Sequence, residues 1–384
     1  MFDKRELVFG KLAPGESKTW ALPVKVPKET YARVDEVRLK LNELTHQGAN
    51  AGRVVVTIDE LPRPHFAYAW QLKDFDKGNG DGQLDPGEEV ELVVSVKNVG
   101  KGAAQDTFMN LKNLSGEVIY IEQGRAKLGS LAPGEEKEAV LKFVAKHDPQ
   151  QAKTADLKLS VVDVALNEQL TEKLRFDLGD ARQTAKVETK RVSLKATADR
   201  LAVYAAASEK SDLLAFLPKG TALKASALVV ADGKSFYRVA FDKRQAFVNA
   251  SGAEVGNGAA GKKPEAVFPH TTPDIAIADG IRGTRTTTPT SPLKGFATSA
   301  KQMRDVYIFV NEQKVFYQTA QKDEASKDGS FKHAFETVLP LKIGTNTVTV
   351  VAREDEETAA RQTFVLFREG ETPVATAQPS AQAP

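Results

Sequence analysis

The side chains with the clearest chemical potential lie in one acidic, glycine-rich stretch, Asp74–Glu88. An EF-type calcium loop places oxygen ligands at positions 1, 3, 5, 7 and 12 and a glycine at position 6. With Asp81 at position 5, Gly82 takes position 6 and Lys77 falls at position 1, where it cannot be a ligand, so Asp76 has to replace it. The candidate metal ligands are the oxygen donors Asp74, Asp76, Asn79, Asp81, Gln83 (through its carbonyl) and Glu88.

The donor types in this stretch also indicate which metal would bind. Hard oxygen donors without His or Cys favour calcium over zinc, and their flexible spacing favours calcium over magnesium. The alternative is a solvated loop in which Asp and Asn side chains only stabilise turns. The spaced donors and glycines exceed what turns need, so we expect calcium in a structural role, holding together carboxylates that would otherwise repel one another.

Patterns typical of catalysis are absent from the rest of the sequence. Ser291-Pro-Leu-Lys294 matches Ser-x-x-Lys, but that pair works from a helix, and Pro292 and Gly295 predict the start of a strand. No Gly-x-Ser-x-Gly motif occurs. No histidine has a second histidine at metal-ligand spacing, so we expect surface or turn positions for all of them. The histidines are His46, His65, His147, His270 and His333.

Length and composition exclude further classes of partner and site. A chain of 384 residues is expected to form about two to four domains. Its 53 basic and 51 acidic residues give no electrostatic reason to propose nucleic acid or an anionic membrane as partner. The sequence has no cysteine, which excludes disulfides and thiolate metal sites, and no apolar run long enough to span a bilayer. Because residues 1–6 lack an apolar signal core, the chain is either cytosolic or begins downstream of its export signal.

An internal repeat organises the first half of the chain. Gly10-Lys-Leu-Ala-Pro-Gly-Glu16 recurs as Gly129-Ser-Leu-Ala-Pro-Gly-Glu135, and the alternating apolar residues that follow keep the register. A repeat of this length is a whole domain. The second copy runs from about Phe66 to Leu178, whereas the first has only its last half, so its missing strands are expected before Met1 and the chain reads as part of a longer protein. Trp20 is expected in a core or an interdomain contact.

Each copy is expected to be a β-sandwich. Alternating segments such as Val90–Val96 and Leu157–Val162 are separated by turn residues every 8–12 positions, with almost no helical periodicity. The phrase Val90–Gly100, followed by Leu131-Ala-Pro-Gly-Glu135, resembles the immunoglobulin-like modules that are often appended to bacterial exported proteins. The resemblance covers most of residues 66–180.

The next unit is similar to a bacterial SH3 barrel. Its Leu217-Pro-Lys-Gly220 turn is followed by Phe236-Tyr237 and Ala246-Phe-Val248, where that family has Trp-Tyr and Gly-Trp-Val. The aromatic residues could line a groove for peptide or glycan, or could pack in the core of so small a unit. The candidate groove residues are Tyr204, Phe236, Tyr237 and Phe247.

The last domain carries the sharpest resemblance. Arg304–Tyr317 contains a strand, an Asn-Glu-Gln-Lys hairpin connection and a second strand, and Asn346–Glu356 continues the pattern. These segments resemble the terminal sandwich of some exported tail-specific (C-terminal-processing) serine peptidases. The resemblance implies a PDZ domain and a Ser–Lys catalytic domain upstream of such modules. Nothing in this chain matches that catalytic part, so no catalytic residue is carried over.

The sequence therefore predicts an all-β, multidomain array of immunoglobulin-like sandwiches with one SH3-like barrel. The expected units are 1–62 (partial sandwich), 63–181 (sandwich with the acidic calcium-type loop), 187–256 (SH3-like barrel), 257–271 (linker), 272–369 (terminal sandwich) and 370–384 (disordered tail).

The expected function is a non-catalytic spacer or binding region of an exported serine peptidase, in the periplasm, at the cell envelope or secreted. Its partners would be the upstream peptidase domain and, in addition, peptide, peptidoglycan or glycan. The alternative is a stand-alone cell-surface adhesion or glycan-binding protein. A hydrolase acting by itself is disfavoured, because the sequence shows no pair of nucleophile and base.

Overall fold

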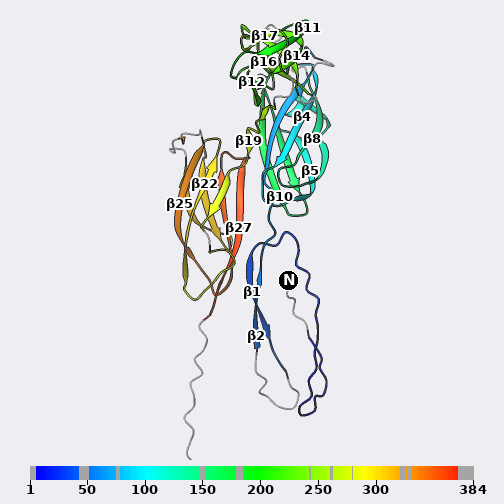
Figure 1. Cartoon of the computed structure of the whole chain (residues 1–384). Helices are drawn as coiled ribbons and strands as arrows, with labels where there is room; N and C mark the ends of the chain where they lie inside the picture. Colours follow the sequence, from blue (N-terminus) through cyan, green and yellow to red (C-terminus); the bar gives the residue numbers. More distant parts are fainter. Residues whose placement is uncertain are drawn as a thin grey trace, which may run out of the picture.

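The computed structural model describes residues 6–42, 52–74, 78–146, 152–178, 185–241, 244–259, 263–278, 280–320, 325–326 and 330–370. Within these ranges the chain is all-β, with only two short 3-10 turns, η1 (Gly116–Val118) and η2 (Ala250–Gly252). No helix in this part of the chain is long and apolar enough to cross a membrane. Figure 1 shows three folded units and an N-terminal segment that extends away from them.

The middle unit is the predicted sandwich. One of its sheets has the order β3-β4-β8-β6, extended beyond β3 by β19 from the linker, and the other has the order β10-β9-β5-β7. The strands are β3 (Phe66–Lys73), β4 (Glu89–Asn98), β5 (Ala104–Asn113), β6 (Ile119–Gln123), β7 (Arg125–Leu131), β8 (Glu136–Ala145), β9 (Thr154–Asp163) and β10 (Glu168–Asp177).

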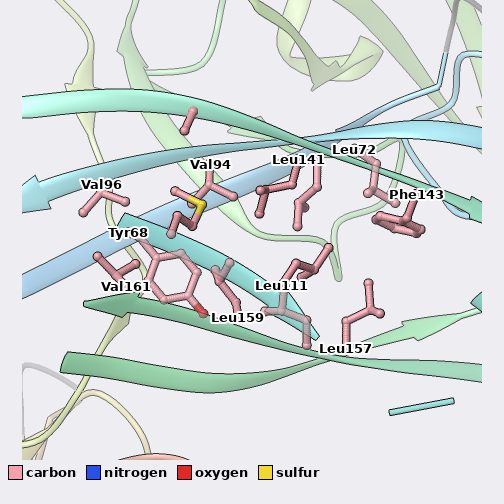
Figure 2. Close-up of a cluster of buried hydrophobic side chains, with 14 of the residues drawn as sticks. Tyr68, Leu72, Val94, Val96, Leu111, Leu141, Phe143, Leu157, Leu159 and Val161 are labelled. Carbon is pink, nitrogen blue, oxygen red and sulfur yellow. The ribbon is translucent and has the colours of Figure 1, made fainter. Parts of the chain in front are cut away.

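The core of this sandwich forms because alternate side chains of a strand share one face. Strand β4 buries Val90, Leu92, Val94 and Val96, as the sequence predicts. Figure 2 shows these strands contributing to a single core, in which side chains of β3, β4 and β8 meet those of β5 and β9.

The unit predicted as an SH3-like barrel is a single coiled sheet of order β17-β11-β14-β15-β16-β12-β13-β18. Its strands are β11 (Lys186–Ala196), β12 (Arg200–Tyr204), β13 (Leu213–Pro218), β14 (Ala222–Ala231), β15 (Lys234–Phe241), β16 (Arg244–Asn249), β17 (Ala253–Val255) and β18 (Glu265–Ala266). Apolar side chains of β11 to β17 enclose its main core, and a second, smaller apolar cluster involves β14, β15 and β16. Among the residues described, β17 and β18 end the sheet without pairing with each other, so the barrel is not closed.

The terminal unit is a second complete sandwich, with sheets of order β20-β22-β25 and β21-β27-β26-β23-β24. Its strands are β20 (Asp274–Ile277), β21 (Arg285–Thr286), β22 (Thr290–Ser299), β23 (Asp305–Val310), β24 (Gln313–Thr319), β25 (Phe331–Pro340), β26 (Gly344–Arg353) and β27 (Ala359–Arg368). The connection between β23 and β24 is shorter than the predicted four residues. Asn311 and Glu312, with φ of 49° and 69°, make a two-residue turn whose twist matches that of the strands.

The N-terminal segment contains one hairpin, β1 (Arg33–Leu39) with β2 (Gly52–Ile58), beside strand β27 of the terminal unit. The prediction that Trp20 lies in a core or an interdomain contact is wrong, because its side chain is 54% exposed and its ring packs edge-on with that of the nearby Phe9. The residues described before β1 form no strand, since a strand needs a partner for its backbone groups.

The linker joins all three folded units by strand pairing. β18 pairs with β13 of the coiled sheet, β19 (His270–Thr271) pairs with β3 of the middle sandwich, and β20 pairs with β22 of the terminal sandwich. Since only a few residues separate these short strands, the chain is anchored to the folded units from residue 265 to residue 277. The expected disordered tail, apart from Gly370, lies outside the described residues, as do Asp76, His46 and His147.

Candidate functional site

The acidic loop connects β3 to β4 and folds around the carboxylate of Asp74. Its Oδ2 atom accepts hydrogen bonds from the backbone N–H groups of Gly80, Asp81 and Gly82, each at 3.1 Å. Gly80 and Gly82 have φ of 79° and 77°, a region in which L side chains are strained, and this backbone turns consecutive N–H groups inward. The glycines therefore shape the loop.

Glu88 closes the other side of the loop. Its Oε1 atom accepts from the N–H of Asn79 at 3.0 Å and its Oε2 atom from the N–H of Asp85 at 3.1 Å. The side chain of Asn79 donates to Asp85 at 2.8 Å. Most of the hydrogen bonds to the carboxylates of the loop therefore come from its own backbone N–H groups.

These carboxylates carry an electrostatic cost. Burial, together with the charge of Asp74, raises the pKa of Asp81 to about 6 and that of Glu88 to about 7. The pKa values of Asp74 and Asp85 are also raised, again mainly by burial. A bound proton or cation would relieve this repulsion.

The structure places five of the six predicted metal ligands in this loop and leaves Asp76 outside the described residues. Asp74, Asp81 and Glu88 are buried. Across the described ranges, no group of three or more His, Cys, Asp or Glu side chains is arranged as a metal site. The carboxylates point mainly at backbone N–H groups, so the calcium site stays a prediction.

The acidic loop is also an interdomain contact, which the sequence did not reveal. The carbonyl of Asp81 accepts from the N–H of Ala207 at 2.9 Å, and that of Gly80 accepts from Arg238 at 3.1 Å. A Cβ atom at Gly82 would lie 2.9 Å from the ring of Phe247. The loop is therefore packed between the middle sandwich and the coiled sheet.

A second cluster lies where all three folded units meet. His270 of the linker stacks on Tyr68 of the middle sandwich, with ring centroids 4.7 Å apart. Its Nδ1 atom lies 3.1 Å from Glu172 and its Nε2 atom 2.5 Å from Asp212 of the coiled sheet. We call Tyr68, Glu172, Asp212, His270 and Lys301 the junction cluster.

Glu172 is the acceptor at the centre of the junction cluster. Besides His270, it accepts from the hydroxyl of Tyr68 at 2.6 Å and from Lys301 of the terminal unit at 2.6 Å. Burial alone would raise the pKa of Glu172, but hydrogen bonds and charges from His270 and Lys301 lower it to about 2. For His270 the directions are reversed: burial alone would lower its pKa, but hydrogen bonds and charges from Asp212 and Glu172 raise it to about 9. His270 and Glu172 therefore form a buried ion pair.

The prediction of surface or turn positions for the histidines is wrong for His270 and His333, which are both buried. His65 is mostly buried, with its Nε2 atom 3.1 Å from Thr271, and burial lowers its pKa. No local pattern around His270 could have indicated its role, because its partners are distant in sequence.

The predicted groove aromatics are mostly buried, Tyr237 in the main core of the coiled sheet and Phe236 and Phe247 in a second, smaller apolar cluster. Phe236, Tyr237 and Phe247 are buried and have almost no surface for a ligand, whereas Tyr204 is half-buried and packs edge-on against Phe236. Ser291 and Lys294 lie on strand β22, as predicted.

An open hollow lies elsewhere, on the outer face of the terminal unit. Strands β23, β26 and β27 line a hollow of about 590 Å³. Tyr307 and Phe309 meet edge to face in it, with centroids 5.5 Å apart. Thr349 and Arg361 are among its polar lining. Aromatic rings beside hydroxyl and guanidinium groups provide both a stacking surface and hydrogen-bond donors.

No protein-family model matches the chain, and no curated protein matches its sequence. Similar solved structures are the fibronectin(III)-like modules of Clostridium thermocellum CbhA, dimeric latent PorU from Porphyromonas gingivalis, and Dpr2 Ig1-Ig2 in complex with DIP-Theta Ig1-Ig3. Each is 10% identical, and the matches cover 79%, 84% and 80% of this chain and 94%, 26% and 100% of those chains. The TM-scores are 0.17, 0.21 and 0.20.

Proposed function

We propose that the chain is a non-catalytic spacer and binding region of an exported serine peptidase, which holds or presents the catalytic part. The junction cluster carries the proposal. It ties the middle sandwich, the coiled sheet and the terminal sandwich together through Glu172, Asp212 and Lys301. With the strand-paired linker and the packed acidic loop, it would fix the angles between the units, as a spacer requires.

The peptidase part of this proposal rests on the resemblance of residues 304–317 and 346–356 to terminal modules of tail-specific peptidases. The partner would be a peptidase domain of the same protein, in the periplasm, at the cell envelope or secreted. Sequencing the genomic DNA upstream of the first codon tests this. We expect an in-frame catalytic domain with a Ser–Lys pair; an upstream region without any peptidase reading frame would contradict the proposal.

The second candidate function is a stand-alone cell-surface adhesion or glycan-binding protein. The hollow at Tyr307 and Phe309 favours it, because aromatic rings stack on the apolar faces of sugar rings. A glycan array and a peptidoglycan pull-down with the full chain separate the two functions. Strong saccharide binding that Tyr307→Ala abolishes would favour adhesion, whereas no binding would favour the spacer.

We also propose that calcium binds the acidic loop in a structural role. The raised pKa values of Asp81 and Glu88 support this, since a cation would offset the repulsion among the buried carboxylates. Calorimetric titration of the full chain with calcium is expected to give heat of binding and a higher melting temperature. At calcium one hundred times above its dissociation constant, the expected stabilisation is about 2.7 kcal/mol.

The matched variants for this titration are Asp81→Asn, which should lose the effect, and Asp199→Asn on the exposed surface, which should retain it. If wild-type protein shows neither heat nor a change in melting temperature, the calcium proposal is wrong, and protein hydrogen bonds hold the loop without a cation.

A further inference from the structure

The two copies of the internal repeat share the same local structure. Gly10 and Gly129 have φ of 68° and 72°, and Gly15 and Gly134 both have φ of 80°. In the first copy the N–H of Ala13 donates to the carboxylate of Glu16 at 2.8 Å. In the second copy Ala132 donates to Glu135, also at 2.8 Å.

The lysine that follows each turn is also placed in the same way. Lys18 donates to the carbonyls of Phe9 and Lys11, at 3.0 and 2.7 Å. Lys137 donates to the equivalent carbonyls of Leu128 and Ser130, at 3.2 and 2.5 Å. Both copies then continue into an antiparallel hairpin, β1 with β2 and β9 with β10. The turn of the first copy is therefore folded as that of the second is, although residues 18–26 form no strand where the second copy has β8.

The apolar side chains of the two copies differ sharply in exposure. In the second copy Leu131, Leu141 and Phe143 are fully buried. Their equivalents are 44–49% exposed, and the neighbouring apolar residues in the same register are 44–57% exposed. The exposed set is Leu12 (49%), Trp20 (54%), Leu22 (44%), Val24 (47%), Val26 (44%), Leu39 (47%) and Leu41 (57%). We call residues 9–42 with this exposed set the half-sandwich surface.

The second copy shows what covers such a surface. Strand β8 lies between β4 and β6, with Leu141 opposite Leu92 and Phe143 opposite Val90 and Ile121. Strand β9 pairs with β5 on the other sheet. The cover is thus the first half of the same domain, residues 66–123, and among the described residues no strand pairs with residues 9–26.

We propose that the half-sandwich surface is a docking surface for the first half of an immunoglobulin-like sandwich, a polypeptide of the kind formed by residues 66–123. The partner adds strands on both sides of residues 18–26 and closes its apolar face over Trp20, Leu22 and Val24. Recognition combines main-chain pairing with pockets for alternate side chains. Pro23 stands where β8 has Lys142, so the surface offers one backbone donor fewer than β8 does.

This inference stands on the repeat and does not depend on the function proposed above. The test is a fusion that places a second copy of residues 63–127 directly before Phe9 of the full chain, where Leu128 follows in the natural repeat. Hydrogen exchange measured by mass spectrometry should show amides 18–26 protected at least about a hundredfold more than in the unfused chain. A control fusion with Leu92→Asp and Val94→Asp in the added copy only should leave them unprotected.

A second measurement covers the case in which the added copy fails to fold. In a Trp70→Phe background, a synthetic peptide of residues 89–98 is titrated onto the full chain, and a saturable blue shift of Trp20 emission is expected. The Leu92→Asp peptide should give no shift. Absence of both protection and shift overturns the proposal. Protection of amides 18–26 in the unfused chain that disappears on dilution also overturns it, because the occupant is then a second copy of this chain.

Discussion

Replacing Glu172 with alanine is expected to lower the free energy of unfolding by about 3–5 kcal/mol, because removing one partner of a buried ion pair leaves the charges that it balanced only partly compensated. Glu172 accepts hydrogen bonds from Tyr68, His270 and Lys301, and its loss leaves all of them short of an acceptor. Denaturant unfolding of the full chain measures the effect.

The same change should also loosen the terminal unit, since Lys301 would no longer reach the middle sandwich. Limited proteolysis between residues 263 and 278 is expected to become faster in Glu172→Ala. The control is Glu122→Ala, at an exposed position of the same sandwich. A loss of less than about 1 kcal/mol for Glu172→Ala, with unchanged proteolysis, would mean that the junction cluster does not couple the units.

The sequence predicts those features that depend on neighbours along the chain. Alternation fixes which face of a strand is apolar, and this is why the buried face of β4 was foreseen from Val90 to Val96. The turn at Asp232-Gly233 depends on neighbours in the same way, since both residues tolerate positive φ, and the structure has 50° and 72° there. Each of these patterns depends only on residues that lie a few positions apart in the sequence.

Features that depend on distant partners were missed. Trp20 has the alternation of a buried strand, but burial requires a second sheet, and the pattern says nothing about whether one is present. His270 has unremarkable neighbours in sequence, and its burial arises only when Tyr68, Glu172 and Asp212 come together from different units. The packing of the acidic loop against Ala207 and Arg238 was not predicted either, because these residues are distant from the loop in sequence.

Because His270 is charged in the ion pair of the junction cluster, the free energy of unfolding also depends on pH. The pKa of His270 is about 9 in the folded chain, against 6.5 for an unperturbed histidine. A group whose folded pKa is raised contributes all of its stabilisation below the unfolded pKa and loses it as the pH rises through the folded pKa. The stabilisation from His270 is therefore complete below pH 6.5 and lost by pH 9.

Between these values the free energy of unfolding should fall by about 1.4 kcal/mol per pH unit from this group, about 3 kcal/mol in all. Glu172, Asp212, Lys301 and Tyr68 face His270, and the pKa of Tyr68 is raised well above 10, so tyrosine stays neutral across this range. Denaturant unfolding at pH 6 and at pH 9.5 is compared for wild type, His270→Gln and, as a control, His333→Gln.

Wild type and His333→Gln are expected to lose stability together as the pH rises, whereas His270→Gln should be less stable at pH 6 and show a smaller loss. The difference between wild type and His270→Gln should therefore shrink toward pH 9.5. If that difference is the same at both pH values, His270 is not protonated in the folded chain, and hydrogen bonds of a neutral imidazole hold the three units together.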